Sequence, residues 1–319
     1  MVKTKALIYM NPGNPVFIDE DIESPGQNQV GIEIITSSLC NTSELRSFKG
    51  DYTEGYGVNY PMKTGEPGHE AAGRIVELGA GSKGFALGDY VVVTGHGGNP
   101  CHRSRVNRKC DDIAAVHPKN RDISEAAVLE MYGCAYHCAL TPISPEGYAG
   151  KRVLVIGMGS MGLCTVQILK NLNTTELVAM DLSTERLALA EKSGADRMVR
   201  PDEVENTEKF DVIIECSGSV SGQETACAMA PKVLIFSSYN TKGIAIKQNL
   251  WFDAQTSIYN PGIVTSENFK KVAELYNKEM IDPSILISKR ISPNEKEYLE
   301  TIDEIKAGKL VKVLMEWNN

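Results

Sequence analysis

Glycines spaced for dinucleotide binding lie near the middle of the chain. The run has the pattern G-x-G-x-x-G and comprises Gly157, Met158, Gly159, Ser160, Met161 and Gly162. In this pattern the first glycine permits a tight turn, the second lets the backbone approach a pyrophosphate, and the third lets a helix pack closely on a strand. The helix N-terminus then presents free N–H groups to the phosphates. The run therefore predicts a dinucleotide site.

An acidic residue follows at the distance that such a site requires. Asp181 lies 19 residues after Gly162, at the end of the apolar run ELVAMD. A carboxylate there can accept hydrogen bonds from both ribose hydroxyls and would repel a 2′-phosphate, which favours NAD over NADP. The alternative is a glycine turn in an α/β domain that binds no cofactor, but the flanking strand and helix patterns favour the binding site.

Four further residues have the types that bind zinc. Cys40 lies in LCNTSELRS, His69 and Glu70 lie in EPGHEAAG, and Glu130 lies in AVLEMYGC. Thiolate and imidazole are good zinc ligands, and a carboxylate can complete the shell. Because the segments are far apart in the chain, their spacing alone does not distinguish a metal site from buried core residues.

The chain divides into two regions that differ in their predicted secondary structure. The first ~120 residues predict a β-rich domain, and an apolar stretch over 123–140 predicts a helix that begins at Asp122 or Ser124. From Lys151 onward, strands alternate with helices, which implies βαβ units and a parallel sheet. The expected strands are 1–10, 29–35, 72–78, 90–94, 152–156, 176–181, 211–217, 232–239 and 311–317, and the expected helices include 160–171, 184–194 and 295–307.

Length and composition exclude several classes of protein. A chain of 319 residues predicts about two domains, and 42% hydrophobic with 23% charged residues is typical of globular proteins. The formal net charge of −8 argues against a nucleic-acid binder, and no apolar window approaches the ~18 residues of a membrane span. Eight cysteines without a signal-peptide pattern predict a cytoplasmic protein with free thiols.

Longer segments around these motifs resemble the zinc-dependent medium-chain dehydrogenase/reductase family, and within it the sorbitol and threonine dehydrogenases. The similar segments are GHEAAGRIVELGAGSKGFALGDYVVV, LEMYGCAYHCAL and the cofactor segment that begins at AGKRVLVIGMGSMG. The resemblance implies a GroES-like catalytic domain (1–125 and 284–319), a doubly wound Rossmann domain (126–283), and a site in the cleft between them.

The resemblance also implies roles for individual residues. Cys40 and His69 would bind one catalytic zinc ion, with Glu70 or Glu130 as a carboxylate that either coordinates it or supports it from behind. Thr42 would relay the substrate proton outward, while hydride passes between a secondary alcohol (a polyol, sugar or cyclitol) and NAD. Ser217 would lie in a cofactor-side loop, and the neighbouring Cys216 is expected to be a packed thiol.

Four departures from the family pattern affect these expectations. A relay histidine is replaced by Leu45, and an aspartate by Ser43. The residue after Glu130 is not proline, and Cys134, one helical turn further on, is an alternative ligand.

The fourth departure concerns the second, structural zinc site of the family. Only Cys101 and Cys110 remain there, too few for a closed tetrahedral site, unless His96 and His102 join them. We therefore expect that the structural zinc is absent.

Other features are less specific. The basic cluster of Arg103, Arg105, Arg108 and Lys109 is expected to be a solvated loop, with phosphate binding as the alternative. Tyr52, Tyr239 and Trp251 are candidates to line the substrate cleft. The family resemblance implies a homodimer or homotetramer, with residues 256–265 as the candidate sheet edge. The alternatives to the dehydrogenase are a zinc-free quinone or enone reductase and a catalytically silent NAD-binding protein.

Overall fold

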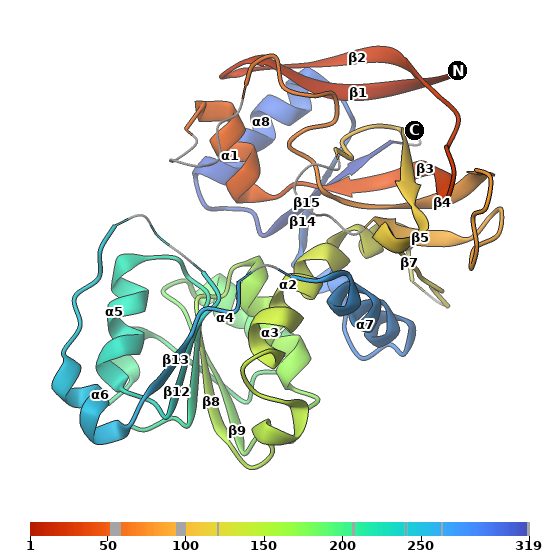
Figure 1. The fold of residues 1–319 in the computed structure, drawn as a ribbon. Coiled ribbons are helices and arrows are strands. Elements are labelled where there is room, and N and C mark those ends of the chain that lie inside the picture. Colours follow the sequence, from red (N-terminus) through yellow and green to blue (C-terminus); the bar gives the residue numbers. More distant parts are fainter. Residues whose placement is uncertain are drawn as a thin grey trace. The chain divides into compact units, whose positions relative to one another are not determined.

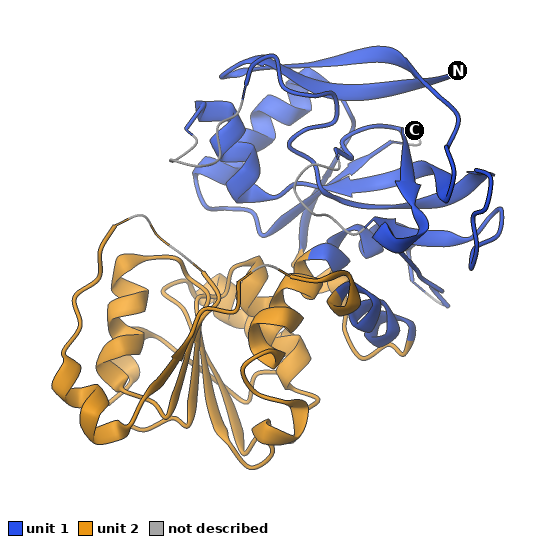
Figure 2. Ribbon diagram, in the orientation of Figure 1, with its two compact units in different colours: residues 1–130, 269–277, 287–319 blue, residues 131–268, 278–286 orange. Residues whose placement is uncertain are grey.

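The computed structural model describes residues 1–51, 59–93, 100–119, 121–205, 208–238, 240, 242–262 and 264–317. These residues form two compact units (Figure 2). Unit 1 comprises Met1–Glu130, Phe269–Asn277 and Ile287–Asn319, and unit 2 comprises Met131–Asn268 and Lys278–Leu286.

Unit 1 is built on a mixed sheet of seven strands. Strand β3 is central, because it pairs with β4 along one side and with β6 and β15 along the other (Figure 1). The strands in sheet order are β14 (Ile287–Ile291), β15 (Lys312–Glu316), β3 (Gln29–Ser38), β4 (Glu70–Leu78), β5 (Tyr90–Val93) and β7 (Ile113–Ala115), with β6 (Arg105–Lys109) beside β3. An antiparallel hairpin of β1 (Val2–Asn11) and β2 (Asn14–Ile22) forms a separate two-stranded sheet.

Two helices of unit 1 lie side by side against this framework. Helix α1 (Asn41–Lys49) follows directly on β3, and α8 (Glu295–Lys306) leads toward β15 (Figure 1). The core that they close includes Leu7, Ile32, Ile34, Tyr298 and Ile302, all fully buried. The remaining helices of this part of the chain are η1 (Cys110–Asp112), η2 (Ile123–Val128) and α7 (Ser266–Asn277).

Unit 2 contains a sheet of six parallel strands. The order β10-β9-β8-β11-β12-β13 corresponds to 3-2-1-4-5-6 in chain order, which is the doubly wound Rossmann arrangement. The strands are β8 (Arg152–Ile156), β9 (Glu176–Met180), β10 (Arg197–Val199), β11 (Val212–Glu215), β12 (Val233–Phe236) and β13 (Ser257–Tyr259). Strand order reverses between β8 and β11, and a crevice at such a point is where ligands of these folds bind.

Helices cover both faces of this sheet (Figure 1). Helices α3 (Ser160–Leu169) and α4 (Thr184–Ser193) lie on one side, and α5 (Val220–Met229) lies on the other. The other helical segments are η3 (Pro145–Tyr148), η4 (Pro201–Glu203), α6 (Gln248–Ala254) and η5 (Pro283–Leu286). The predicted α/β class, a Rossmann sheet with a second β-rich domain, is confirmed.

The helix predicted over 123–140 is in fact two elements. Residues Ile123–Val128 form the 3-10 helix η2, and the α-helix α2 begins only at Leu129 and ends at Leu140. Asp122 is the N-cap, because its side chain accepts a hydrogen bond from Ser124 N at 3.0 Å. Small buried side chains at Ala126 and Ala127 pack η2 against β3 and β4, and this tertiary packing overrides the continuous helical pattern.

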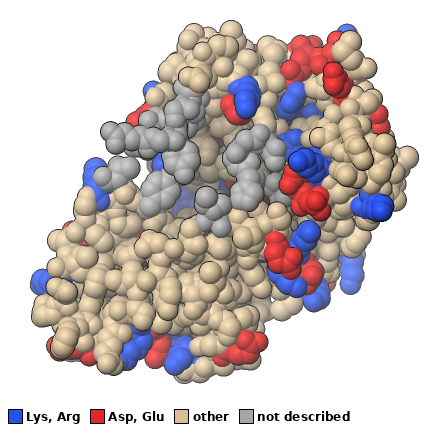
Figure 3. Space-filling model, viewed as in Figure 1, with Lys and Arg blue, Asp and Glu red and all other residues tan. Residues whose placement is uncertain are grey.

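Charged side chains of both signs lie beside one another on the face shown in Figure 3. Within unit 2, Arg152 and Arg197 both pair with Glu176 and Glu208. Among the described residues, none of the helices has the length and apolar character needed to cross a membrane.

Candidate functional site

Cys40, His69 and Glu70 come together in unit 1. Their ligand atoms all lie within 4.8 Å of one another, and in the described part of the chain they form the one group of three or more such side chains. Cys40 is the N-cap of α1, and Glu70 is the first residue of β4. His69 donates Nδ1–H to Pro67 O at 2.9 Å, and its Nε2 lies 3.9 Å from Glu70 Oε1.

The thiol and the imidazole of this cluster form a coupled pair. Burial would raise the pKa of Cys40, but a hydrogen bond with His69 and its charge lower the pKa to about 7. Burial would likewise lower the pKa of His69, but the interaction with the Cys40 sulfur raises it well above its usual range. The pair therefore favours a thiolate beside an imidazolium, and a thiolate is the form in which cysteine binds metals.

A buried lysine holds Glu70. Lys312 Nζ donates to Glu70 Oε1 at 2.5 Å and to Oε2 at 2.6 Å, and both side chains are almost fully inaccessible to solvent. Burial alone would lower the pKa of Lys312, but the adjacent Glu70 raises it above its usual range. Since β15 carries Lys312 and β4 begins at Glu70, the lysine links two strands that flank the end of β3.

Glu130 is electrostatically coupled to the same cluster, although it is not one of the three grouped donors. Burial raises its pKa to about 7; His69 opposes this shift, while Glu70 and Cys40 add to it. The predicted carboxylate is therefore near the pair, at the start of α2. Cys134, the alternative ligand, also lies outside the group of donors within 4.8 Å.

Thr42 and Leu45 lie on the helix that Cys40 caps. Thr42 is exposed in the first turn of α1, two residues after Cys40. Leu45 is partly buried and packs against the hydrophobic core of unit 1. A hydroxyl at Thr42 is thus accessible to solvent, whereas the Leu45 position supplies packing and no proton acceptor.

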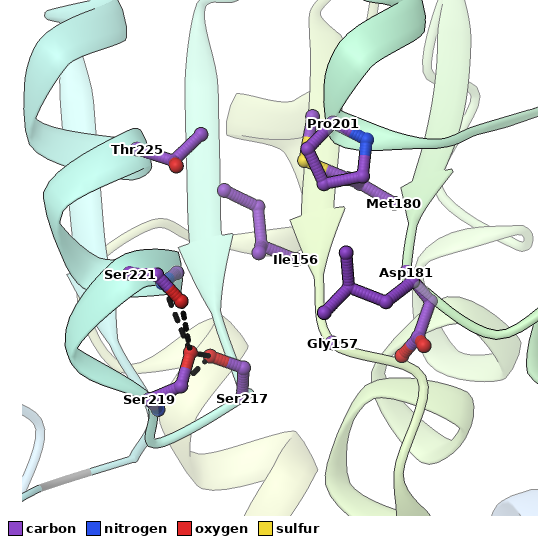
Figure 4. Close-up of a pocket in the computed structure, with 11 residues that line it drawn as sticks. Ile156, Gly157, Met180, Asp181, Pro201, Ser217, Ser219, Ser221 and Thr225 are labelled. Atoms are coloured by element: carbon purple, nitrogen blue, oxygen red, sulfur yellow. Dashed lines mark hydrogen bonds between the residues drawn. The ribbon is translucent and has the colours of Figure 1, made fainter.

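Gly157, the first glycine of the fingerprint, lines a cavity of about 330 Å³ in unit 2 (Figure 4). The cavity lies at the carboxyl ends of β8, β9 and β11, where the strand order reverses. Its walls are formed by Ile156, Gly157, Met180, Asp181, Leu182, Pro201, Ser217, Ser219, Ser221, Gly222 and Thr225. In Figure 4 the Asp181 carboxylate lies on one side and the serine side chains lie on the other.

A side chain at each of the three fingerprint glycines would have a different consequence. Gly157 has φ +90°, and a Cβ there would lie 2.6 Å from Ser217 Cα. A Cβ at Gly162 would lie 1.9 Å from Gly157 O, so the helix packs directly on the turn. A Cβ at Gly159 would enter open space, which is the space a phosphate needs beside the start of α3.

The first turn of α3 contains the other two predicted residues, Ser160 and Met161. No acidic side chain lies in this turn, and Gly159 provides no side-chain cap. The N–H groups of the turn and the helix dipole therefore favour an anion here.

Asp181 is anchored beside this turn. Its Oδ2 accepts from Met158 N at 2.6 Å, and its Oδ1 accepts from Ser183 N at 2.9 Å. These bonds fix the carboxylate at the cavity wall while leaving it further acceptor capacity.

Ser217 follows β11 on the opposite wall. Glu215, fully buried, accepts hydrogen bonds from Ser217 N at 2.7 Å and from the Ser217 and Ser238 hydroxyls. Cys216 is buried, and burial raises the pKa of its thiol, as expected for a packed cysteine.

Residues 101–110, where the family resemblance implies a structural zinc lobe, contain a buried cysteine and a buried histidine. Cys101 is fully buried, and His102 bonds through both ring nitrogens to Ser37 and Glu44. The histidine is thus engaged in protein hydrogen bonds. His96 lies outside the described residues.

The prediction of a solvated basic loop is wrong. Residues Arg105–Lys109 form β6, where Arg105 pairs with Glu77, and the preceding Arg103 pairs with Glu20. Arg108 is buried and donates to the carbonyls of Asn107 and Pro100 at 2.9 and 2.7 Å. The three guanidinium groups contact carboxylates or backbone carbonyls of unit 1, so these arginines stabilise the fold.

Of the three aromatic candidates, only Trp251 is described; Tyr52 and Tyr239 lie outside the described residues. Trp251 Nε1 donates to Cys227 O at 2.8 Å, and the ring packs on the core of unit 2. It thereby supports α6 and α5 against one another.

Lys312, Glu44 and Ser37 are three buried polar residues near the site that the sequence did not predict. Lys312 left one readable trace, since a single lysine interrupts the apolar strand VKVLMEW. A charge at an inward position of such a strand needs a buried partner.

Comparisons with known proteins agree with this geometry. The family description "Alcohol dehydrogenase GroES-like domain" matches residues 26–165, and "Zinc-binding dehydrogenase" matches residues 160–278. The chain is 27% identical to a sorbitol dehydrogenase of Halalkalibacterium halodurans over 98% of both chains. It is 30% identical to an L-threonine 3-dehydrogenase of Paraburkholderia phytofirmans over 62% of this chain and 66% of that one.

Its fold is also that of a solved structure. A zinc-binding dehydrogenase of Sinorhizobium meliloti bound to NADP superposes with a TM-score of 0.81 at 21% identity, covering 99% of this chain and 100% of that one. The two family matches overlap at residues 160–165 and together span both the metal cluster and the dinucleotide cavity. This chain therefore belongs to the zinc-type medium-chain dehydrogenase/reductase family of oxidoreductases, as its GHE and glycine-rich segments predicted.

Proposed function

We propose that this protein is a zinc-dependent oxidoreductase that transfers a hydride between a secondary alcohol and NAD. The observation that carries the proposal is the convergence of Cys40, His69 and Glu70 in a chain that also has a dinucleotide cavity with Asp181 at its wall. Either feature alone would fit a binding protein. Together they supply a metal-binding donor set and a hydride acceptor site.

The donor set fits zinc. Zinc bonds of about 2.0–2.3 Å put tetrahedral ligand atoms roughly 3.5 Å apart, and the three donors already lie within 4.8 Å of one another. Sulfur, nitrogen and oxygen donors of this kind suit zinc rather than calcium or magnesium. Cys40 and His69 would be ligands, and Glu70 or Glu130 would complete the shell.

A zinc ion bound there would supply Lewis acidity at the substrate oxygen. The chain's own residues would do the rest. Thr42, exposed beside Cys40, would accept the substrate proton and pass it to water, since Leu45 cannot accept it. Lys312 would hold Glu70 in place from the side of β15. Asp181 would orient the adenosine ribose, and the Gly159 turn would hold the pyrophosphate.

The preference for NAD and for a polyol, sugar or cyclitol rests on separate support. Asp181 would repel a 2′-phosphate, which favours NAD even though the relative with a similar fold holds NADP. The polyol class is supported by the sorbitol dehydrogenase relative, which aligns over nearly the whole chain.

Two broader properties are proposed with this function. The eight free cysteines support a reducing, cytoplasmic location, and the exposed edge strand β13 supports a homodimer or homotetramer.

The test is NADH formation by zinc-loaded protein with sorbitol, other polyols, cyclitols and L-threonine. We expect turnover with at least one secondary alcohol, a preference for NAD over NADP, and loss of turnover in Cys40→Ala. Turnover of quinones or enones that Cys40→Ala leaves intact would instead identify a zinc-free reductase. NAD binding without turnover of any substrate would identify a silent cofactor-binding protein.

A further inference from the structure

A polar chain of side chains lies in the core of unit 1, apart from the three grouped donors. His102 Nδ1 contacts Ser37 Oγ at 2.8 Å, and His102 Nε2 contacts Glu44 Oε1 at 2.8 Å. All three residues are 0% exposed. In an accessible site these residue types would form a nucleophilic triad, but a fully buried serine cannot meet a substrate. The chain must serve another purpose.

Outer donors complete this buried network. Trp317 Nε1 donates to Ser37 Oγ at 2.9 Å, and the Tyr298 hydroxyl donates to Glu44 Oε2. Each of these four contacts has a single hydrogen if the Ser37 hydroxyl donates to His102 Nδ1 and His102 Nε2–H donates to Glu44. The hydrogens then all run toward one carboxylate, and such satisfied networks hold a buried region in a single arrangement.

The network brackets Cys40 in the sequence. Ser37 lies three residues before Cys40, at the end of β3, and Glu44 lies four residues after it, in α1. Glu44 N also donates to Cys40 O at 2.9 Å, which is the first hydrogen bond of the helix. His102, by bonding to both Ser37 and Glu44, therefore fixes the strand-to-helix turn at whose corner Cys40 lies.

The same histidine is fixed to the segment that carries His69. His102 N donates to Gly65 O at 3.0 Å, and Cys101 N donates to Gly68 O at 3.0 Å. A Cβ at Gly68 would lie 2.4 Å from His102 Cγ, so the imidazole ring packs on the α-carbon just before His69. A single side chain thus touches both segments that carry the thiol and imidazole donors.

We propose that His102 is a positioning residue for the metal site: with Ser37 and Glu44 it sets the separation between the Cys40 and His69 segments. This inference rests on the proposed zinc site but concerns residues outside it. Residues that orient metal ligands from behind typically change metal affinity by about 10–100-fold when they are replaced. Here the support acts through the backbone of both segments rather than by a bond to a ligand side chain.

Three variants test the proposal. His102→Leu removes both hydrogen bonds, Ser37→Ala removes one of them, and His102→Gln can still donate to Glu44 and accept from Ser37. The matched control is His137→Gln, which replaces a buried histidine of unit 2 that contacts Pro261 O and Thr141. Circular dichroism checks the fold, competition with a chromophoric chelator measures Zn²⁺ affinity, and the visible spectrum of the Co²⁺-substituted protein reports ligand geometry.

We expect His102→Leu to bind Zn²⁺ about 10–100-fold more weakly and to shift the thiolate-to-cobalt band, with His102→Gln recovering part of the affinity and His137→Gln unchanged. If His102→Leu does not fold, the weaker affinity and shifted band are expected in Ser37→Ala. Wild-type affinity and spectrum in every folded variant would overturn the inference while leaving the zinc site intact. If Cys40→Ala binds Zn²⁺ as the wild type does, the proposed site fails and the inference fails with it.

Discussion

Glu70 and Glu130 are the two acidic side chains coupled to Cys40 and His69, and they differ in what balances their charge. Both oxygens of Glu70 accept hydrogen bonds from Lys312, so a cation of the fold already neutralises it. Burial raises the pKa of Glu130, and Glu70 and Cys40 raise it further, while His69 and Lys312 oppose the shift. We therefore expect Glu70 to matter for stability as well as for metal binding.

Breaking the ion pair should destabilise the fold. Lys312→Met would leave Glu70 as a buried carboxylate without its ammonium, and Glu70→Gln would leave Lys312 as a buried cation. Each should lower the free energy of unfolding by about 3–5 kcal/mol, measured by urea denaturation.

Glu130→Gln is the comparison for this pair. It should lower Zn²⁺ affinity with a smaller loss of stability, because the amide matches the carboxyl group in size and leaves the Glu70–Lys312 ion pair in place. Equal stabilities of Lys312→Met and the wild type would contradict this account of the pair.

Asp181 determines the expected cofactor preference. Asp181→Ala removes the acceptor for the ribose hydroxyls, and hydrogen bonds to charged groups contribute about 1.5–3 kcal/mol. The KM for NAD should therefore rise about 10- to 100-fold, and the ratio of NADP to NAD efficiency should rise, in steady-state kinetics.

The neighbouring Asp202→Ala serves as the control, because its side chain is 79% exposed and pairs only loosely with Arg200. An unchanged cofactor preference in Asp181→Ala would show that another group binds the ribose hydroxyls.

At the scale of elements, the turn between β8 and α3 combines packing with ligand access. Gly162 allows the helix to touch the turn, and Gly159 leaves the space in front of the helix open. The two positions lie three residues apart, yet an added methyl group should affect the stability of the fold at Gly162 and the binding of NAD at Gly159.

Gly162→Ala should lower the free energy of unfolding by about 1–3 kcal/mol, since its Cβ would overlap Gly157 O. Gly159→Ala should keep the wild-type melting temperature and weaken NAD binding, because its methyl group occupies the phosphate space. Differential scanning calorimetry and NAD titration measure the two effects. A destabilised Gly159→Ala that binds NAD normally would contradict these roles.

The strands and helices around the motifs could be read from the sequence because their signals are local. The strand over 152–156, the glycine turn and the helix after it form one continuous pattern, and the structure places them as predicted. The change from 3-10 to α-helix at Leu129 could not be read, because it depends on packing against strands distant in sequence.

The same limit applies to the site. Cys40, His69 and Glu70 could be named from their local contexts, but the pairing of Glu70 with Lys312 spans 242 residues. The contact of His102 with Glu44 spans 58 residues. Such contacts are decided by strand order in three dimensions, which a single sequence leaves open.

At the scale of the whole molecule, the edge strand β13 is the feature that bears on assembly. It ends the six-stranded sheet, all three of its residues are exposed, and Ile258 and Tyr259 are each 39% exposed. An exposed apolar edge strand is a template for pairing with another chain. It also lies within residues 256–265, the predicted edge.

We therefore expect a homodimer or homotetramer in solution that Ile258→Lys weakens, because a lysine on an edge strand opposes pairing. Light scattering across a range of concentrations measures the mass. Lys192→Ala is the control, because this exposed lysine lies on α4, which packs on β9 and β10 at the opposite end of the same sheet. A wild-type monomer at all concentrations would contradict the assembly proposal.

The central claim is that Cys40 and His69, with an adjacent carboxylate, bind one catalytic zinc ion. The most direct test is the zinc content of purified, zinc-supplied protein by elemental mass spectrometry, compared with Cys40→Ala and with Cys110→Ala as a control outside the site. We expect about one zinc ion per chain in the wild type and in Cys110→Ala, and none in Cys40→Ala. Zinc that Cys40→Ala retains, or no zinc in the wild type, would contradict this claim.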